Sequence, residues 1–416
     1  MNSTREENAV LKGKTILLGI SGSISAYKMA HLASLLQQAG ASVYVIMTKN
    51  ACRFIDPVVF DTLTRHRTVL DDFDRANESP VSHIDLPKMA DAFLVAPASA
   101  DIIAKAALGI ADDMLSSAII AAYSCPLLIA PAMNVHMFEN PVVQENLKKL
   151  QDRGWTVVAP GIGFQACGDM GSGRLPEGEE LFEWLEMACG AEKDLKGKKV
   201  LVTSGATREA IDPVRFITNH STGKMGTAIA RAAAMRGAEV TLVAGDMRVP
   251  APQFVNTVKV VSAEEMFNAV TAVSDQQDII IMAAAVADFR PVEVASEKIK
   301  KKNTGTETTI TLTRTHDILA WCGEHKPEGQ FLCGFAMETT DLLQNAGEKL
   351  RKKKADMIVA NSLRAAGAGF GTDTNVVTFL RPDGMEELPI LSKNEVADRI
   401  LDQIIKERGT DQRDEF

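Results

Sequence analysis

Two stretches of the chain share one order of apolar and polar residues. Residues 12–48 hold a basic lead-in, an apolar run, a small-residue turn, a helical pattern over Ala26–Gln38 and a second apolar run. Residues 196–245 repeat that order, with an Ala-rich helical pattern over Thr227–Met235. Continuous apolar runs are typical of parallel strands covered on both faces, and strands that alternate with helices are typical of α/β folds. The pattern therefore predicts two α/β domains in one chain.

The predicted fold class is α/β, with two Rossmann-like three-layer domains whose sheets are mainly parallel. A length of 416 residues suits two domains. The short polar linker Asp194–Lys198 separates the two halves. We therefore expect an N-terminal domain over residues 1–194 and a C-terminal domain over residues 195–416.

In the first half, two apolar runs that we expect to be strands, Ala92–Ala96 and Leu127–Ala130, each end in a proline followed by small or polar residues. Helices are expected over Asn50–Thr64 and Val135–Leu150. In an open parallel sheet, ligands bind beyond the carboxyl ends of the strands, so both strand ends should border a site. Asn134, at the second of these ends, suits a carboxylate or amide ligand, or else caps the helix that follows.

Several features of the first half leave a functional and a structural interpretation open. The turn Ser21-Gly22-Ser23 precedes a helix and suits a phosphate, or its glycine only makes the turn. His83 lies in an expected loop, where it is catalytic or merely solvated. Residues 161–175 hold five glycines and almost no helix or strand pattern, which favours a flexible flap over a ligand. Cys167 in that flap is a mobile thiol that can donate a proton, or an incidental surface cysteine.

In the second half, a strand expected over Asp278–Ala285 ends close to Asp288, whose carboxylate suits a metal–phosphate unit. The loop 206–226 contains Gly-Lys without the spacing of a Walker A motif, which excludes that motif. The charge run at 297–302 is a solvated loop, or a lysine flap that closes over a triphosphate. A further strand is expected over Thr308–Thr313.

The composition argues against several classes of protein. A net charge of -9 with interspersed signs argues against a general nucleic-acid binder, so no nucleic-acid partner is expected. The N-terminus shows no apolar signal region, and no apolar run reaches membrane-spanning length, so no membrane partner is expected. Six cysteines lie far apart without a Cys-x-x-Cys pair, which favours a reduced, cytoplasmic chain without disulfides or a zinc site.

Four motifs of the first half, GISGSISAYK, PASAD, PAMNVHMF and QACGDMGSGRL, resemble those of the flavin-dependent cysteine decarboxylases, and most closely phosphopantothenoylcysteine decarboxylase. The resemblance covers about residues 12–190 and implies a Rossmann-like, FMN-binding fold that forms trimers with the flavin at the subunit contact. It implies His83 as the active-site histidine, Asn134 as the residue that holds the substrate carboxylate, and Cys167 as the proton donor. The implied FMN-binding residues are Gly22, Ser23, Ile24, Thr48, Ser99, Ala100, Asp101 and Ala132.

Motifs of the second half, DPVRFITNHSTGKMG, AAAVADFRP, EKIKK, HDIL and GFAMET, resemble phosphopantothenate–cysteine ligase over about residues 195–405. This resemblance implies CTP as co-substrate, Mg²⁺ as metal, paired ligase domains, and an acyl cytidylate that the cysteine amine attacks. It implies Asn219 as the catalytic contact to the acyl intermediate, Lys298 as the flap lysine at the triphosphate, and Asp288 at the metal. The implied nucleotide-binding residues are Met282, Ala283, Ala284, Asp288, Lys298, Asp317, Ile318, Leu319, Phe335, Lys349 and Lys353.

Together the resemblances imply a bifunctional, homo-oligomeric enzyme of coenzyme A synthesis that acts on small molecules. The C-terminal domain would join 4′-phosphopantothenate to cysteine, and the N-terminal domain would decarboxylate the resulting 4′-phospho-N-pantothenoylcysteine to 4′-phosphopantetheine. The alternatives are a peptidyl-cysteine decarboxylase, a flavin prenyltransferase and a flavin-binding regulatory protein. The ligase motifs argue against the first two, and the joint presence of His83, Asn134 and Cys167 argues against the third.

Overall fold

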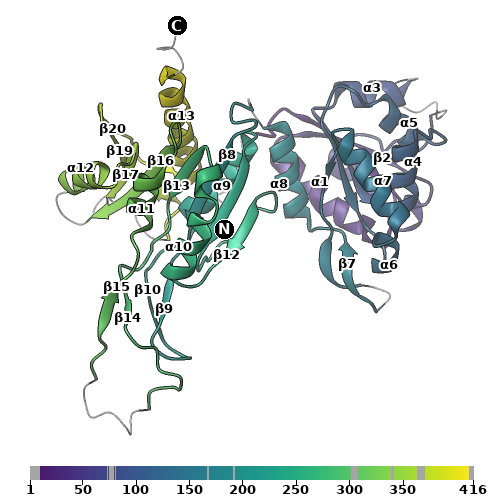
Figure 1. The fold of residues 1–416 in the computed structure, drawn as a ribbon. Helices are drawn as coiled ribbons and strands as arrows, with labels where there is room; N and C mark the ends of the chain where they lie inside the picture. Colours follow the sequence, from purple (N-terminus) through teal and green to yellow (C-terminus); the bar gives the residue numbers. More distant parts are fainter. Residues whose placement is uncertain are drawn as a thin grey trace. The chain divides into compact units, whose positions relative to one another are not determined.

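The computed structural model describes residues 10–72, 74, 79, 81–165, 168–190, 193–300, 308–338, 342–362 and 371–411. The chain divides into two compact units, unit 1 over residues 1–191 and unit 2 over residues 192–416. Each unit has its own sheet and its own hydrophobic core (Figure 1).

Unit 1 alternates strands with helices. Its strands are β1 (Thr15–Ile20), β2 (Ser42–Met47), β3 (Ala92–Ala98), β4 (Leu127–Pro131), β5 (Thr156–Val157), β6 (Gly161–Phe164) and β7 (Met170–Arg174). Its α-helices are α1 (Lys28–Gln38), α2 (Val58–Thr64), α3 (Ser82–Met89), α4 (Ala100–Leu108), α5 (Met114–Ala121), α6 (Val135–Phe138), α7 (Pro141–Asp152) and α8 (Gly178–Cys189). Two short 3-10 helices are η1 (Ile24–Tyr27) and η2 (Ala51–Arg53).

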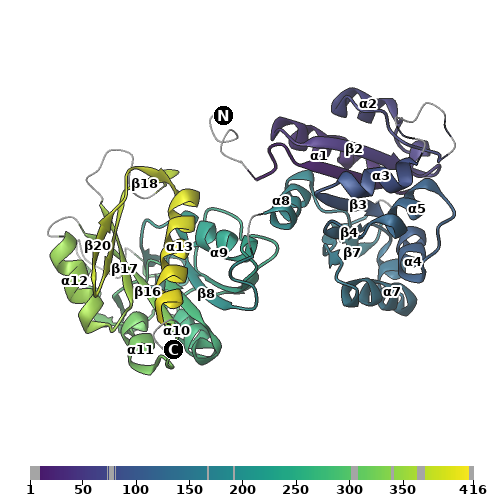
Figure 2. The ribbon, with the colours of Figure 1, turned by 90° about the horizontal axis from the view of Figure 1, so that it is seen from above.

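The main sheet of unit 1 is parallel throughout, in the order β2-β1-β3-β4-β5. Alternate residues of its strands enter two separate cores. Ile16 and Leu18 of β1 pack with α1, α2 and α8, whereas Leu17 packs with α3, α4, α5 and α7. In both ribbon views α1 and α8 lie side by side (Figures 1 and 2). Helices therefore cover both faces, which explains why the strands are continuous apolar runs.

Unit 2 has a larger sheet and three smaller antiparallel pairs, β9–β10, β14–β15 and β18–β21. Its strands are β8 (Lys199–Ser204), β9 (Arg208–Ala210), β10 (Phe216–Thr218), β11 (Glu239–Ala244), β12 (Asn256–Lys259), β13 (Ile279–Met282), β14 (Phe289–Pro291), β15 (Leu312–Arg314), β16 (Phe331–Glu338), β17 (Met357–Ser362), β18 (Thr374–Asn375), β19 (Val377–Arg381), β20 (Gly384–Glu387) and β21 (Leu391–Ser392). Its helices are α9 (Lys224–Met235), α10 (Ala263–Thr271), η3 (Ser274–Gln276), α11 (Ile318–His325), α12 (Leu342–Lys352) and α13 (Lys393–Asp411).

The main sheet of unit 2 runs β12-β11-β8-β13-β16-β17-β19-β20, parallel as far as β17 and antiparallel at the end. One face packs on α9 and α13, and the other on α10, α11 and α12. The pairs β9–β10 and β14–β15 extend together from one end of this unit (Figure 1). The predicted fold class, two α/β units with mainly parallel sheets, is confirmed.

Two predicted helices of the first half begin differently. The span Ala26–Gln38 starts as the 3-10 turn η1, which Ser23 caps, and becomes an α-helix only at Lys28. The prediction of one helix over Asn50–Thr64 is wrong, because the segment contains η2 and then α2, which starts after Pro57. Proline lacks the backbone N–H that a continuous helix needs there.

Two other predictions around helices are also wrong. The helix expected over Val135–Leu150 is split into α6 and α7, where the Asn140 side chain caps the second helix and Pro141 occupies its first position. His83 lies in the first turn of α3 and not in a loop. That short helix includes Pro87, which is buried with Leu86, so tertiary packing outweighs the weak local propensity.

The strand predictions need two corrections. Residues 161–164 and 170–174 form β6 and β7, which pair into an antiparallel hairpin, so the expected lack of strand structure is wrong. A role of this hairpin as a flap over a ligand stays a prediction. Its glycines serve close packing: a Cβ at Gly171 would lie 2.5 Å from Val135 Cγ2, and one at Gly173 would lie 2.3 Å from the Met133 carbonyl oxygen. The strand expected over Thr308–Thr313 is shorter and later, as β15.

Among the described residues, no helix combines the length and the apolar character needed to cross a bilayer.

Candidate active sites

The carboxyl ends of β1 to β4 meet at one edge of the unit 1 sheet, because these strands are parallel and adjacent. Each predicted FMN-binding residue follows one of these strands. Gly22, Ser23 and Ile24 follow β1, Thr48 follows β2, Ser99, Ala100 and Asp101 follow β3, and Ala132 follows β4. The fold thus brings residues from four separate strand ends to a common edge, where ligands of open α/β sheets bind.

Hydrogen bonds hold these strand ends in register. The Ser21 hydroxyl donates to the Pro97 carbonyl at 2.7 Å and accepts from the Ser99 amide at 2.9 Å. The Ala132 amide donates to the Ala98 carbonyl at 3.0 Å. The Ser99 side chain in turn caps α4. These hydrogen bonds therefore fix the segments that follow β1, β3 and β4 relative to one another.

Asp101 is directed along its own helix. Its carboxylate lies 3.4 Å from the Lys105 ammonium, which also contacts Asp112 at 2.9 Å and Asp113 at 3.5 Å. The hydrogen bond to Asp112 and the three carboxylate charges raise the pKa of Lys105, although burial opposes this. Asp101 therefore shares one lysine with two other carboxylates, and the N-terminus of α4 is capped by Ser99 instead.

Asn134 connects the end of β4 to the β6–β7 hairpin. Its side-chain oxygen accepts a hydrogen bond from the His136 amide at 2.9 Å, as a helix cap. Its side-chain nitrogen donates to the Asp169 carboxylate at 2.7 Å and to Gln165 Oε1 at 3.4 Å. The helix-cap interpretation of Asn134 is therefore confirmed, and its side-chain nitrogen contacts a carboxylate of the protein itself. Binding of a ligand carboxylate by Asn134 stays a prediction.

Of the other two predicted catalytic residues of unit 1, the structure describes His83 but not Cys167. Cys167 lies outside the described residues, although Gln165 and Asp169 on either side of it both contact Asn134. His83 Nδ1 lies 3.0 Å from Asp72 Oδ1, and both atoms are buried. A carboxylate this close to one ring nitrogen restricts the orientation of the imidazole.

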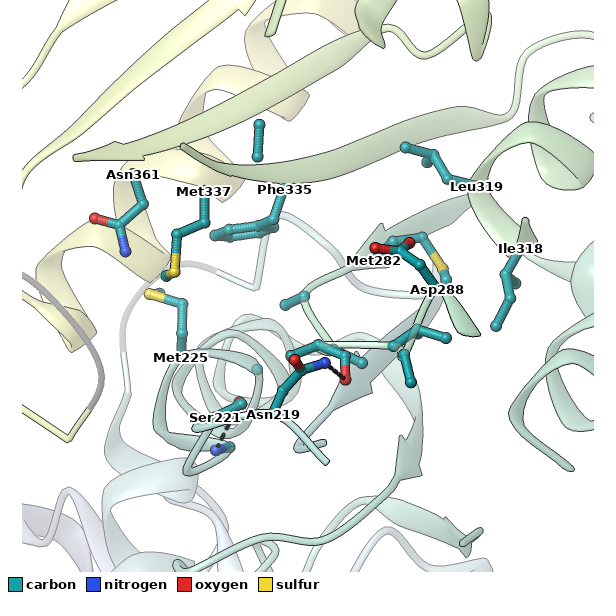
Figure 3. Close-up of a pocket in the computed structure, with 18 of the residues that line it drawn as sticks. Asn219, Ser221, Met225, Met282, Asp288, Ile318, Leu319, Phe335, Met337 and Asn361 are labelled. Carbon is teal, nitrogen blue, oxygen red and sulfur yellow. Dashed lines mark hydrogen bonds between the residues drawn. The ribbon is translucent and has the colours of Figure 1, made fainter. Parts of the chain in front are cut away.

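In unit 2, one cavity of about 970 Å³ gathers most of the predicted ligase residues (Figure 3). The predicted residues that line it are Asn219, Met282, Ala283, Ala284, Asp288, Asp317, Ile318, Leu319, Phe335 and Lys349. They come from β13, β16, α11, α12 and the segments that follow β10 and β13. Figure 3 shows Asp288, Ile318 and Leu319 on one side of the cavity and Asn361, Met337 and Met225 on the other.

The segment after β13 is fixed by polar contacts to the end of β8 and to the segment that follows it. The buried Thr203 hydroxyl accepts a hydrogen bond from the Ala284 amide at 3.1 Å, and the Thr207 hydroxyl accepts from the Ala287 amide at 2.9 Å. The Asn219 side chain donates to the Ala285 carbonyl at 3.1 Å. Asn219 is thus held against the backbone that forms the cavity wall.

Asp317 and two lysines form a charged group at the α11 N-terminus. Its carboxylate caps α11 through the Ala320 amide at 2.9 Å and forms an ion pair with Lys353. Burial alone would raise the pKa of Asp317, but the Lys353 hydrogen bond, the Ala320 amide and the charges of Lys353 and Lys349 lower it. Lys349 also donates to the Phe335 carbonyl at 2.7 Å. Asp317 therefore stays ionised at neutral pH.

Two predicted ligase lysines do not line the cavity. Lys298 is exposed in the segment between β14 and the undescribed residues 301–307. Lys353 reaches the site only through its ion pair with Asp317. A ligand that contacts Lys298 therefore requires that segment to approach the cavity.

Sequence reasoning missed other polar residues of this cavity. Lys224 donates to the Asp373 carboxylate at 2.6 Å and to the Gly371 carbonyl at 2.9 Å. Burial and the nearby Lys224 charge lower the pKa of Lys393, an effect that Asp373 partly offsets. Asn361 and Asn375 are buried in the lining. Among these residues, only Lys224 stood out in the sequence, because it forms the Gly-Lys pair with Gly223. Lys393 lies far from it in sequence, so no local pattern links the two.

The described residues contain no group of three or more His, Cys, Asp or Glu side chains that could hold a metal ion by themselves. Asp288 contributes a single exposed carboxylate to the cavity. Magnesium in phosphate-transferring sites is commonly held by one or two carboxylates together with substrate phosphates and water. The donor set therefore fits a magnesium ion that enters with a nucleotide, and not a permanently caged metal.

Two family descriptions match the chain, one on each unit. Residues 195–407 match "DNA/pantothenate metabolism flavoprotein C-terminal domain", and residues 4–189 match "Flavoprotein".

Curated relatives match nearly the whole chain. The coenzyme A biosynthesis bifunctional protein CoaBC of Bacillus subtilis (strain 168) is 48% identical over 399 residues, which cover 95% of this chain and 97% of that protein. The protein of the same name from Escherichia coli (strain K12) is 42% identical over 396 residues, with coverage of 95% and 97%. A crystal structure of the C-terminal domain of CoaBC is 47% identical and covers 52% of this chain and 98% of its own, with a TM-score of 0.44.

The similarity spans both units and almost the full length of these relatives. A peptidyl-cysteine decarboxylase, a flavin prenyltransferase or a regulatory flavoprotein would account for unit 1 alone. The chain therefore belongs to the family of bifunctional coenzyme A biosynthesis proteins CoaBC, and it is an enzyme with phosphopantothenoylcysteine decarboxylase and phosphopantothenate–cysteine ligase activities.

Proposed function

We propose that unit 1 binds FMN at the carboxyl edge of its sheet. The residues there fit the group: small side chains cap η1 and α4 and leave backbone amides for a phosphate, and Ile24 is 62% exposed beside them for an apolar ring. When bound, the flavin would supply an electron sink for the thiol-bearing carbon and return the electrons after CO₂ has left. The match of residues 4–189 to the family described as "Flavoprotein" supports a flavin cofactor.

The chain's own residues would bind the substrate and move its protons. The Asn134 amide already binds the carboxylate of Asp169, so the substrate carboxylate would replace Asp169 at that amide. His83, oriented by Asp72, would assist deprotonation of the substrate thiol. Cys167 would donate the proton to carbon after CO₂ release.

For unit 2 we propose a CTP-dependent ligase mechanism. The carboxylate of 4′-phosphopantothenate would attack the α-phosphorus of CTP, releasing pyrophosphate and forming an acyl cytidylate. The cysteine amine would then attack the acyl carbon and displace CMP. Asn219, at the cavity wall, would donate a hydrogen bond to the oxygen that gains charge in this second step. Lys298, Lys349 and Lys353 would offset the charge of the triphosphate, and Asp288 would hold Mg²⁺ with phosphate oxygens.

The observation that carries this proposal is that a single cavity collects residues from motifs spread between Asn219 and Lys349. The cavity volume of about 970 Å³ is at the upper end of typical small-molecule sites, which suits a nucleotide beside a second substrate.

The test uses the purified full-length protein. We expect a yellow protein that forms CMP only when CTP, 4′-phosphopantothenate, cysteine and Mg²⁺ are all present. Replacement of CTP by buffer, or of Mg²⁺ by a chelator, should abolish CMP formation. A colourless protein would contradict the FMN proposal, and CMP formation without 4′-phosphopantothenate would contradict the ligase mechanism.

We also propose that the enzyme is a cytoplasmic homo-oligomer, with trimeric decarboxylase units and paired ligase domains. Apolar side chains stand exposed in unit 1 near the proposed cofactor edge and on the hairpin: Ile24 at 62%, Tyr27 at 62%, Phe164 at 65% and Met170 at 70%. These exposed side chains support the proposal, because exposed apolar patches commonly mark a subunit contact. Sedimentation of the intact protein tests the proposal, and a monomer at micromolar concentration would contradict it.

A further inference from the structure

Asp212 is a buried carboxylate outside the ligase cavity. It lies at the turn between β9 and β10, and its side chain is fully buried although it is ionisable. The hydrogen bonds from Arg215 and from three backbone amides outweigh burial and lower the pKa of Asp212. A buried charge is tolerated only where such partners satisfy it, so this carboxylate has a defined place in the structure.

One oxygen of Asp212 shapes the turn that leads to Asn219. Asp212 Oδ1 accepts hydrogen bonds from the amides of Val214 and Arg215, both at 2.8 Å. The chain then enters β10, and Asn219 follows directly after that strand. This oxygen therefore organises the hairpin itself.

The other oxygen reaches a segment that lies 87 residues further along the chain. Asp212 Oδ2 accepts from the Ile299 amide at 3.2 Å and from Arg215 Nε at 2.9 Å. The Arg215 guanidinium donates in turn to the Ile299 carbonyl at 3.0 Å. Both backbone groups of Ile299 are thus held by one ion pair, and the neighbouring Ala295 amide donates to the Ile211 carbonyl at 3.0 Å.

Ile299 directly follows Lys298, the exposed lysine that the proposed mechanism brings to the triphosphate. We propose that Asp212 is a positioning residue of the ligase. By holding the Ile299 backbone, it anchors the segment that carries Lys298. The lysine side chain then extends toward the nucleotide from a fixed backbone position. This inference rests on the proposed role of Lys298. Anchoring of this kind reduces the conformational freedom that the segment must lose when a ligand binds.

The anchor itself is testable without activity. In Asp212→Asn, one acceptor oxygen becomes an NH₂ group that faces N–H donors, so the contact to Ile299 weakens. Hydrogen exchange of peptides covering residues 292–300 should become at least about tenfold faster than in the unmodified enzyme. Asp383→Asn is the matched control, because Asp383 also pairs with an arginine, Arg381, at 3.1 Å but is 71% exposed on another turn. Unchanged exchange in Asp212→Asn would overturn the inference.

A double-mutant cycle tests the link to Lys298. Asp212→Asn should lower kcat/KM for CTP about tenfold in the unmodified enzyme, but less than about twofold in the Lys298→Ala background. Decarboxylation of preformed substrate by unit 1 should be unchanged in every variant, and a urea titration of each variant reports that unit 2 has folded. Equal losses in both backgrounds would mean that Asp212 acts on the hairpin and Asn219 alone, which overturns the inference.

The two proposals fail differently. If Lys298→Ala leaves kcat/KM for CTP unchanged, the proposed role of Lys298 is wrong, and with it the catalytic purpose of the anchor. If Lys298→Ala lowers kcat/KM while Asp212→Asn changes neither exchange nor turnover, the role of Lys298 stands and the inference about Asp212 falls.

Discussion

The two units use related α/β folds but form their sites differently. In unit 2, side chains from β13, β16, α11 and α12 surround one cavity, and polar contacts from Thr203 and Thr207 fix its wall. In unit 1, the proposed site follows the open edge of a five-stranded parallel sheet. There a hairpin is tied to the edge through Asn134, and several apolar side chains remain exposed.

This difference suits the chemistry of the two reactions. A ligase that handles a nucleotide and a reactive acyl phosphate needs many converging polar groups, which the cavity of unit 2 provides. A decarboxylase that relies on a flavin for its hard step needs few reactive side chains of its own. If the comparison is right, substitutions in one site should leave the other reaction intact.

The largest expected effect is that of Cys167→Ser. Formation of 4′-phosphopantetheine should fall about a thousandfold, because the serine hydroxyl is a much weaker acid than the thiol. One CO₂ should still be released for each flavin, leaving an oxidised enethiol product, and further release should require O₂ to reoxidise the flavin. Quantifying CO₂ and 4′-phosphopantetheine in the same reaction checks this, with CMP formation by unit 2 as the control. Normal turnover to 4′-phosphopantetheine would remove Cys167 from the mechanism.

Asn219→Asp should separate the two half-reactions of the ligase. The added negative charge opposes the developing oxyanion, so amide formation should fall about a hundredfold. Activation of 4′-phosphopantothenate should remain measurable as pyrophosphate exchange into CTP. Decarboxylation by unit 1 is the control and should not change. Equal loss of exchange and of amide formation would argue against a role in the second step.

Gly226→Ala tests the close packing beside the ligase cavity. A Cβ at Gly226 would lie 2.6 Å from both Cβ and Oγ of Ser204, so α9 must shift away from β8. Unit 2 should lose roughly 1–3 kcal/mol of unfolding free energy, measured by urea titration. The control is Gly347→Ala on α12, where no atom lies within 4 Å of the new Cβ; it should stabilise by about 0.5–1 kcal/mol. Similar stabilities of both variants would refute this packing.

Asp169→Asn should strengthen substrate binding in unit 1. The change removes the carboxylate that now binds the Asn134 amide at 2.7 Å and would compete with the substrate carboxylate. The KM for 4′-phospho-N-pantothenoylcysteine should fall about two- to fivefold, with little change in kcat. An increased KM would mean that Asp169 helps to form the site.

The smallest effect is a pH dependence of unit 2. The folded-state pKa of Asp317 lies below its unfolded value, so its ion pair with Lys353 contributes stability above the unfolded pKa. That contribution is lost as pH falls through the lower, folded-state pKa. The stability difference between the enzyme and Lys353→Met should therefore be constant near pH 7 and shrink below about pH 4. A difference that does not depend on pH would contradict this assignment.

Periodicity and strand-end motifs predicted the parts of the fold that local sequence determines. The apolar runs of β1, β3, β8 and β13 became buried strands, and the residues after them came together at sheet edges. The hairpin β6–β7 was missed, because its glycines were interpreted as a sign of flexibility. Gly171 and Gly173 instead allow close contact with Val135 and Met133. Such contacts between distant segments leave no periodic pattern in the sequence.

The same limit applies to the sites. Lys224 and Asp373 form an ion pair across 149 residues, and Asp212 reaches Ile299 across 87. Asp212 and Lys224 lie in the motif DPVRFITNHSTGKMG, but no short motif contains both partners of either pair. The family motifs predicted most residues of the ligase cavity, but the polar network that fixes their backbone became visible only in three dimensions.

The central claim is that each unit catalyses its own step and that the ligase step comes first. The most direct test supplies the full-length enzyme with carboxyl-labelled cysteine and measures labelled CO₂. We predict that release from free cysteine requires 4′-phosphopantothenate and CTP, whereas preformed 4′-phospho-N-pantothenoylcysteine loses CO₂ without any nucleotide. Release from free cysteine in the absence of CTP, or a CTP requirement for the preformed substrate, would contradict the account.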